Sequence, residues 1–175
     1  MNGKIIAIGL VLFAAIFGGA LWYFQTRAYY APIDPGSAAA AIVLTRFDGA
    51  AEPLQTDGFE GVDADTSPLR FRDCFTTPMS LATLTETAQP YERATPLVAP
   101  GWFGCFDAEA IGAALDAGTA LAFLGRSNTP YGIDRVVAVA DDGRGWSWPQ
   151  INACGTAAFA GDPVPDGCPP PPERD

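Results

Sequence analysis

Four cysteines are the residues of this chain whose chemistry is easiest to specify from type and spacing. They are Cys74, Cys105, Cys154 and Cys168. Cysteines near Pro- and Gly-rich segments are typical of an oxidising compartment, where disulfides persist. A bond between Cys154 and Cys168 would close a loop of about 15 residues. In the entropic model, such a bond stabilises the folded protein by about 3 kcal/mol because it restricts the unfolded chain. We therefore expect Cys154 to pair with Cys168, and Cys74 with Cys105.

The cysteines do not match the motifs of two other kinds of cysteine chemistry. The chain contains no CxxC sequence, so the motif of thioredoxin-like redox proteins is missing. The ligands of a Cys₄ zinc site usually come in close pairs, and these four residues do not. Structural disulfides are the better interpretation, and we expect no metal ligand and no cofactor.

A cluster of carboxylates in the segment 52–68 is the second candidate for chemistry. Asp57, Glu60, Asp63 and Asp65 lie there among glycines, and clustered carboxylate oxygens are ligands that Ca²⁺ accepts. Their spacing matches neither an EF-hand nor a β-helix repeat. We interpret the segment as a solvated polar loop.

Two absences restrict the reactions that the chain can catalyse. It has no histidine, and its only lysine is Lys4. This composition excludes Ser-His-Asp and Cys-His nucleophiles, imidazole ligation of metals, lysine Schiff bases and the P-loop lysine. A carboxylate-dependent hydrolase stays an alternative, although 20 acidic residues make some pair inevitable. We expect the protein not to be an enzyme.

An uncharged apolar segment at residues 5–24 must position everything that follows. Twenty helical residues span about 30 Å, which is the thickness of a bilayer's hydrocarbon core. Lys4 precedes the segment and Arg27 follows it. Because four cysteines suit an oxidising compartment, we expect the domain in the periplasm and the N-terminus in the cytoplasm. A cleaved signal peptide is the alternative, because Gly18 and Ala20 would suit a cleavage site.

The remaining chain is long enough for one compact domain. All 20 acidic residues follow the anchor, and this negative charge argues against nucleic acid as a partner. We expect a transmembrane anchor (1–27), a spacer (28–41), a periplasmic α+β domain (42–168) and a Pro-rich tail (169–175).

Periodicity and turn residues predict an antiparallel sheet with one or two short helices. We expect strands at 41–47, 69–75 and 119–124, and a hairpin with arms at 132–140 and 144–148 around Asp141-Asp142-Gly143. The segment 107–118 predicts a helix with Asp107 as its N-cap and Gly118 as its left-handed stop. A second helix is expected at 76–88, with Thr77 as its cap.

The order of several short segments resembles a known family. The segments are RFRDCF at 70–75, APGWFGCFDAEAIGAAL at 99–115, YGIDRVVAVA at 131–140 and the terminal CGTAAFAGDPVPDGCP. The chain resembles short proteobacterial single-pass proteins of unknown function, sometimes labelled histidine kinases. That label does not suit this sequence, because it lacks histidine and a nucleotide-binding glycine motif.

We expect a non-catalytic accessory subunit or assembly factor of a larger inner-membrane complex, for example a respiratory or other electron-transport complex. Small residues in the anchor would let another transmembrane helix approach closely. They are Gly9, Ala14, Ala15, Gly18, Gly19 and Ala20. Such residues are also common in anchors that contact only lipid.

The alternative function is a periplasmic module that binds a small molecule or a glycan. Trp146 and Trp148 are two apart and would share one face of a strand, and Trp102 precedes Cys105. These three residues are a candidate interaction surface. Core packing around a disulfide is the competing interpretation, and we favour it because aromatic residues dominate small cores.

Overall fold

The computed structural model describes residues 3–172. The chain divides into two compact units, residues 1–30 and 31–175. The first contains helix α1 (Gly3–Thr26), in which no residue is buried. This helix is apolar enough, with a mean hydropathy of 2.5, and long enough to cross a membrane. It fits the expected membrane anchor.

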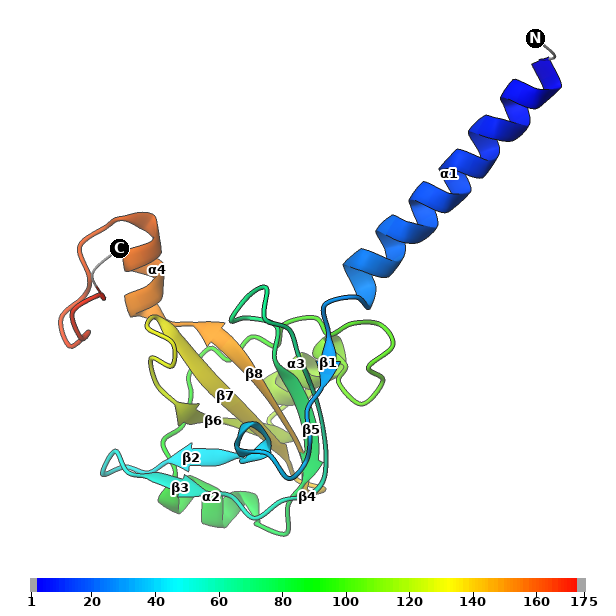
Figure 1. Cartoon of the computed structure of the whole chain (residues 1–175). Coiled ribbons are helices and arrows are strands. Elements are labelled where there is room, and N and C mark those ends of the chain that lie inside the picture. Colours follow the sequence, from blue (N-terminus) through cyan, green and yellow to red (C-terminus); the bar gives the residue numbers. More distant parts are fainter. Residues whose placement is uncertain (1–2, 173–175) are drawn as a thin grey trace. The chain divides into compact units, whose positions relative to one another are not determined.

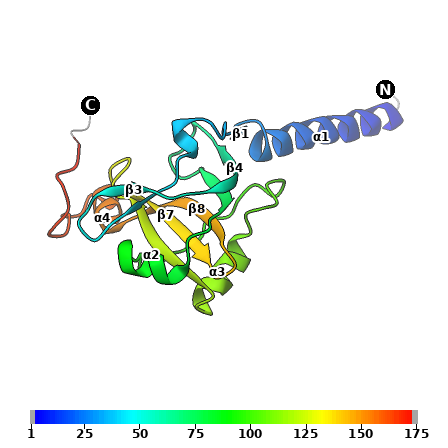
Figure 2. The ribbon, with the colours of Figure 1, turned by 90° about the horizontal axis from the view of Figure 1, so that it is seen from below.

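The second unit is built on a six-stranded antiparallel sheet (Figure 1). Its strands, in spatial order, are β1 (Ala31–Pro32), β4 (Asp57–Asp63), β5 (Arg72–Thr76), β8 (Arg144–Ile151), β7 (Ile133–Ala140) and β6 (Ala120–Arg126). The strand direction turns progressively from β4 to β6 (Figure 1), as the right-handed twist of strands requires. Figure 2 shows β7 and β8 side by side from below.

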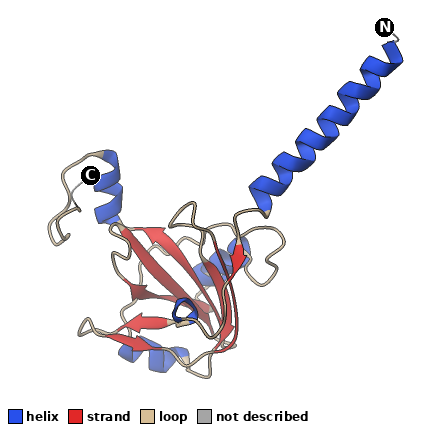
Figure 3. Ribbon diagram, viewed as in Figure 1, coloured by secondary structure: helices blue, strands red, loops and turns tan. Residues whose placement is uncertain are grey.

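A small hairpin and four short helices surround this sheet (Figure 3). The hairpin consists of β2 (Val43–Thr45) and β3 (Ala51–Pro53), and the helices are η1 (Ala38–Ala40), α2 (Leu81–Thr87), α3 (Ala108–Asp116) and α4 (Ala153–Ala160). The expected α+β class with an antiparallel sheet is confirmed.

One face of the sheet forms the main hydrophobic core. Phe75, Phe123 and Val137 project from it and are each at most 3% exposed. They belong to one cluster with Leu44 of β2 and Leu84 of α2. The β2–β3 hairpin and α2 therefore cover this face, because their apolar side chains have no other surface on which to be buried.

The opposite face packs against the chain that leads into α3. The indole of Trp146 donates a hydrogen bond to the carbonyl of Cys105 (3.1 Å). Phe106 meets the ring of Trp148 edge to face, with centroids 6.1 Å apart. Cys74 of β5 is joined to Cys105 by a disulfide. The second disulfide joins Cys154 to Cys168, so both expected pairings are confirmed.

Two local predictions are confirmed in detail. Asp107 caps α3 by accepting hydrogen bonds from the backbone N–H groups of Glu109 and Ala110 (3.0 and 3.1 Å). Gly118 follows that helix with φ +72°, a conformation that costs glycine little. Strands β7 and β8 pair as the expected hairpin, with Gly143 at φ +85° in its turn.

The predicted start of α2 is wrong. Ser80 is the N-cap, and its Oγ accepts a hydrogen bond from the backbone N–H of Thr83 (3.2 Å). Thr77 instead donates its hydroxyl to the carbonyl of Gln55 (2.8 Å). Thr77 is therefore engaged in a long-range hydrogen bond and does not cap the helix, which begins at Leu81.

The predicted polar loop at 52–68 and the predicted spacer at 28–41 are also wrong. Strand β4 occupies 57–63, where charged residues on its exposed positions hide the strand pattern. Strand β1 pairs with β4 through Ala31 and Asp63, and Ala40 of η1 is buried. The domain therefore begins at residue 31.

Helix α4 lies in a region for which no helix was expected. Asn152 caps it by accepting a hydrogen bond from the N–H of Gly155 (2.9 Å), and Gly161 ends it at φ +79°. The tail beyond the domain is anchored in part, because the hydroxyl of Tyr131 donates to the carbonyl of Pro169 (3.0 Å). Residues 173–175 of the predicted tail lie outside the described residues.

Candidate functional site

A pocket lies between residues 38–43 and the core-facing side of the sheet. Its volume is about 180 Å³. One wall comes from η1 and the start of β2, and the other from β4, β6, β7, β8 and Phe71, which directly precedes β5. The lining residues are Ala38, Ala39, Ala41, Ile42, Val43, Asp63, Phe71, Arg126, Thr129, Arg135, Val137 and Ser147. Most of the lining residues are apolar, and Asp63, Arg126 and Arg135 are charged.

Arg135 is the principal charged group of this pocket. Strand β7 carries it on the same face as Val137, because residues two apart in a strand share a face. Its guanidinium carbon lies 3.4 Å from the centroid of the Phe71 ring. Among the residues that the structure describes, no acceptor hydrogen-bonds to this guanidinium and no carboxylate forms an ion pair with it.

A second arginine lies next to Arg135 on the neighbouring strand. Arg126 of β6 is its direct partner in the antiparallel register of β6 and β7. Like charges in such a position repel each other. Burial, aided by the charge of Arg126, lowers the pKa of Arg135, whereas the charges of Asp73 and Asp63 raise it.

Asp73 lies beside the pocket in the centre of the sheet and is 0% exposed. The hydroxyl of Ser147, its partner residue on β8, donates a hydrogen bond of 2.7 Å to Oδ2. Oδ1 is buried without a hydrogen-bond partner in the described part of the chain. Burial raises the pKa of Asp73 to about 7, against lowering by Ser147 and Arg135.

The pair formed by Ser147 and Asp73 has the elements of a nucleophile and a base. Such a pair acts on a substrate only if the hydroxyl can approach the reacting atom. Both side chains are 0% exposed, so a substrate does not reach the Ser147 hydroxyl in this structure. What the pocket offers to a ligand is the guanidinium of Arg135 and its apolar walls.

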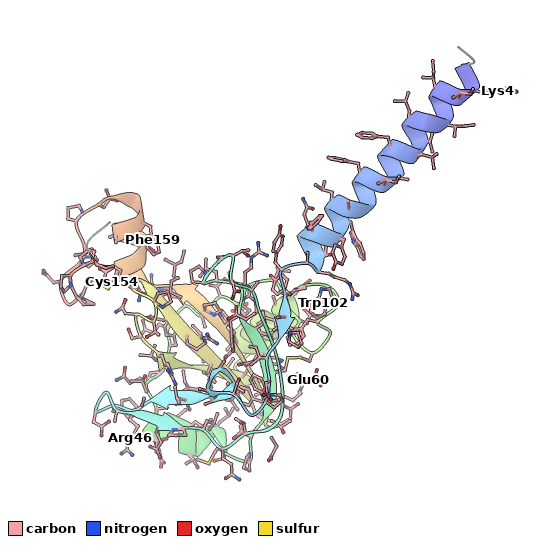
Figure 4. All side chains as sticks on the ribbon, viewed as in Figure 1. Lys4, Arg46, Glu60, Trp102, Cys154 and Phe159 are labelled. Carbon is pink, nitrogen blue, oxygen red and sulfur yellow. A yellow bond between two sulfur atoms is a disulfide. The ribbon has the colours of Figure 1, made fainter. Side chains whose placement is uncertain are left out.

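The structure rejects part of the candidate aromatic surface. Trp148 is 0% exposed and Trp146 is 7% exposed, because both face the chain around Cys105. The favoured interpretation, core packing around a disulfide, is correct for these two residues. Trp102 is half-buried on the loop before α3 (Figure 4), and its role as an interaction residue stays a prediction.

The acidic segment considered for calcium is spread along and beyond a strand. Asp57 and Glu60 are exposed on β4, Asp63 ends that strand, and Asp65 follows it in a turn. No group of three or more His, Cys, Asp or Glu side chains within residues 3–172 is placed to hold a metal ion.

The small residues of the anchor lie on α1 without buried neighbours. A Cβ atom added at Gly9, Gly18 or Gly19 would meet nothing within 4 Å. Ala14 and Ala15 are exposed on the same helix. Their role in packing against a partner helix stays a prediction.

Sequence reasoning missed the residues that give the pocket its charge. Asp73 is far in sequence from Arg126 and Arg135, and only the register of β5 to β8 brings the three residues to one face. One local signal was present. Asp73 lies in the middle of a predicted strand, and a carboxylate in a strand that becomes buried needs a partner or a raised pKa.

Comparisons with known proteins place the chain in a family without adding an activity. No curated protein matches the chain, and no solved structure matches it. The model of a family of unknown function (DUF6446) matches residues 42–169, which include β2 to β8 and α4. The chain therefore belongs to this family of unknown function.

Proposed function

We propose that the protein is a membrane-tethered, non-catalytic binding protein whose domain takes a small ligand into the pocket beneath residues 38–43. One observation carries this proposal. The guanidinium of Arg135 lines the pocket without an acceptor among the described side chains and backbone groups. Its nitrogens keep access to solvent, so a ligand with an acceptor oxygen can replace water on these donors in a charge-assisted hydrogen bond.

The proposed location is the inner membrane of a bacterium, with the N-terminus in the cytoplasm and the domain in the periplasm. Two features support it. Helix α1 is long and apolar enough to span a bilayer, and both disulfides suit an oxidising compartment. The positive charge of Lys4 at the start of α1 favours a cytoplasmic N-terminus.

Blocking the pocket tests this function. Ala41 lines the pocket and is exposed, so Ala41→Phe would fill the space without removing a core side chain. Ligand-observed NMR with a set of small fragments, on the full chain in detergent, should detect binders that the variant loses. Ala50→Phe, in the exposed turn of the β2–β3 hairpin, is the matched control and should keep them. Equal binding by wild type and Ala41→Phe would contradict the proposal.

A second candidate function is that of an accessory subunit or assembly factor in a membrane complex, such as an electron-transport complex. The observation that favours it is the open space above Gly9, Gly18 and Gly19. Bare backbone on a transmembrane helix lets a second helix approach closely and gain dispersion contacts.

Bulk at these positions tests the second candidate. Gly18→Leu and Gly19→Leu would keep a partner helix at a distance, so co-purification of membrane proteins should fall while the domain stays folded. Val11→Leu changes an exposed apolar position of the same helix and serves as the control. Unchanged co-purification by the glycine variants would mean that these positions contact only lipid.

A further inference from the structure

We propose that the pocket binds a small organic monoanion, whose negative group contacts Arg135 and whose apolar body lies against Ala39, Ala41 and Val43. The inference rests on the proposed function, because it requires that the pocket takes a ligand. It adds the chemical class of that ligand.

The orientation of Arg135 indicates the first part of this class. The guanidinium carbon of Arg135 lies over the ring of Phe71, 3.4 Å from the centroid, and this contact leaves the N–H donors without an acceptor among the described residues. The N–H donors of a guanidinium point outward in its plane. They match the two oxygens of a carboxylate better than they match a single neutral acceptor.

The neighbour of Arg135 strengthens the preference for a negative charge. Arg126 is its cross-strand partner, also lines the pocket, and has no ion pair with a described residue. Two like charges in this position destabilise the empty pocket. A bound anion would offset their repulsion, and a bound cation would increase it.

Two carboxylates limit the charge that the pocket accepts. Asp63 lines the pocket, and Asp73 lies close enough to affect the pKa of Arg135. Because burial raises the pKa of Asp73 to about 7, that group is partly neutral near pH 7. Two arginines then exceed the acidic charge by less than one unit, which suits a monoanion better than a phosphate dianion.

The walls and the volume indicate the rest of the ligand. Ala39, Ala41 and Val43 line the pocket and are accessible, so they give an apolar surface that a purely inorganic anion does not use. The volume of about 180 Å³ is comparable to the ~150 Å³ of an engineered cavity that accepts benzene. An aromatic or short aliphatic acid therefore fits, whereas a nucleotide or an oligosaccharide is too large.

Matched probes test the charge and the body of the ligand separately. Benzoate and benzamide have nearly the same shape but differ in charge, acetate and butyrate have shorter bodies, and inorganic phosphate has charge without an apolar body. Titration of the full chain in detergent, by calorimetry at neutral pH, should show benzoate or butyrate binding at least tenfold more tightly than benzamide, acetate or phosphate.

Variants assign the binding to the pocket. Arg135→Gln should weaken benzoate binding at least tenfold and leave benzamide unchanged, and Arg135→Lys should restore part of the loss because it keeps the charge without the fork. Arg144→Gln, at an exposed arginine paired with Asp142, should have no effect. Thermal melts check that each variant is folded. Arg126→Gln, at an exposed position, offers a second charge removal if Arg135→Gln does not fold.

The outcomes separate this inference from the proposed function. If benzamide binds as tightly as benzoate, and Ala41→Phe abolishes both, the pocket binds ligands and the anion class is wrong. If none of the three carboxylates binds, the anion class is likewise wrong, and fragment binding lost in Ala41→Phe still supports the proposed function. If Ala41→Phe changes the binding of no probe and no fragment, the proposed function fails as well.

Discussion

Asp73 is a carboxylate at the centre of a hydrophobic sheet, with one oxygen bonded to Ser147 and the other without a partner in the described structure. Burial raises its pKa from 3.8 to about 7. Between these two values the folded protein retains a proton that the unfolded chain has released. The free energy of unfolding therefore falls as the pH rises from about 4 to about 7 and loses nothing further above that.

Asp73→Asn should remove this dependence on pH. The expected cost of the charge is about 4 kcal/mol at most, since each pKa unit is worth about 1.4 kcal/mol. In urea unfolding at about pH 4.5 and about pH 8, wild type should lose more stability than the variant between the two conditions. Parallel losses in both proteins would show that Asp73 does not titrate in this range.

Ser147→Ala is the informative companion variant. Ser147 donates the hydrogen bond that favours the charged form of Asp73. Its removal should raise the pKa of Asp73 further and extend the pH-dependent loss of stability to higher pH. A lower midpoint of that loss would contradict this account of the carboxylate.

At the scale of elements, Asn152 has two tasks. Its oxygen caps α4 through Gly155 N–H, and its amide nitrogen donates to Asn128 Oδ1 (3.0 Å) and to Asp134 Oδ1 (2.7 Å). Helix α4 is thereby tied to the end of β7, where Asp134 lies 7% exposed.

Asn152→Ala should cost more than the loss of a cap alone. An N-cap is worth about 1 kcal/mol, and removal of a donor to a buried carboxylate adds about 1 kcal/mol or more. Ser80→Ala is the matched control, because Ser80 caps α2 through Thr83 and its hydroxyl meets only Thr83. Chemical denaturation of both variants should rank Asn152→Ala as the more destabilising. Equal losses would mean that the bond to Asp134 adds nothing.

The elements that could be predicted are those whose signals are local. Asp107 and Gly118 mark the ends of α3, and Gly143 marks the turn of the β7–β8 hairpin, because capping and positive φ depend on nearby residues alone. Strand β4 was missed because the exposed Asp57, Glu60 and Asp63 give this segment the composition of a polar loop. Its identity depends on pairing with β5.

The pocket could not be predicted for a related reason. Arg126 and Arg135 line the pocket only because of the register of β6 and β7. A shift by one residue would place their side chains on the other face of the sheet. Helix α4 was missed because Gly155 and Thr156 have weak helix propensity. The caps at Asn152 and Gly161 were nevertheless visible in the sequence.

At the scale of the whole molecule, the orientation of the anchor can be tested directly. Alkaline phosphatase fused after Arg27 should be active, and a fluorescent protein that matures only in the cytoplasm should be dark there, because Lys4 favours a cytoplasmic N-terminus. Moving the positive charge, with Lys4→Glu and Gln25→Lys, should lower the phosphatase activity. A fusion that fluoresces in the wild-type sequence would reverse the proposed topology.

Two parts of the chain form the pocket, and the family model matches only one of them. Arg135, Arg126 and Phe71 lie within residues 42–169, whereas Ala38, Ala39 and Ala41 precede the matched segment. Residues 38–41 can therefore differ in sequence while the segment that the family model matches stays the same. Replacing the sequence of residues 38–41, with β1 still paired to β4, would change one wall of the pocket. The same domain could then be engineered to bind longer or shorter ligands.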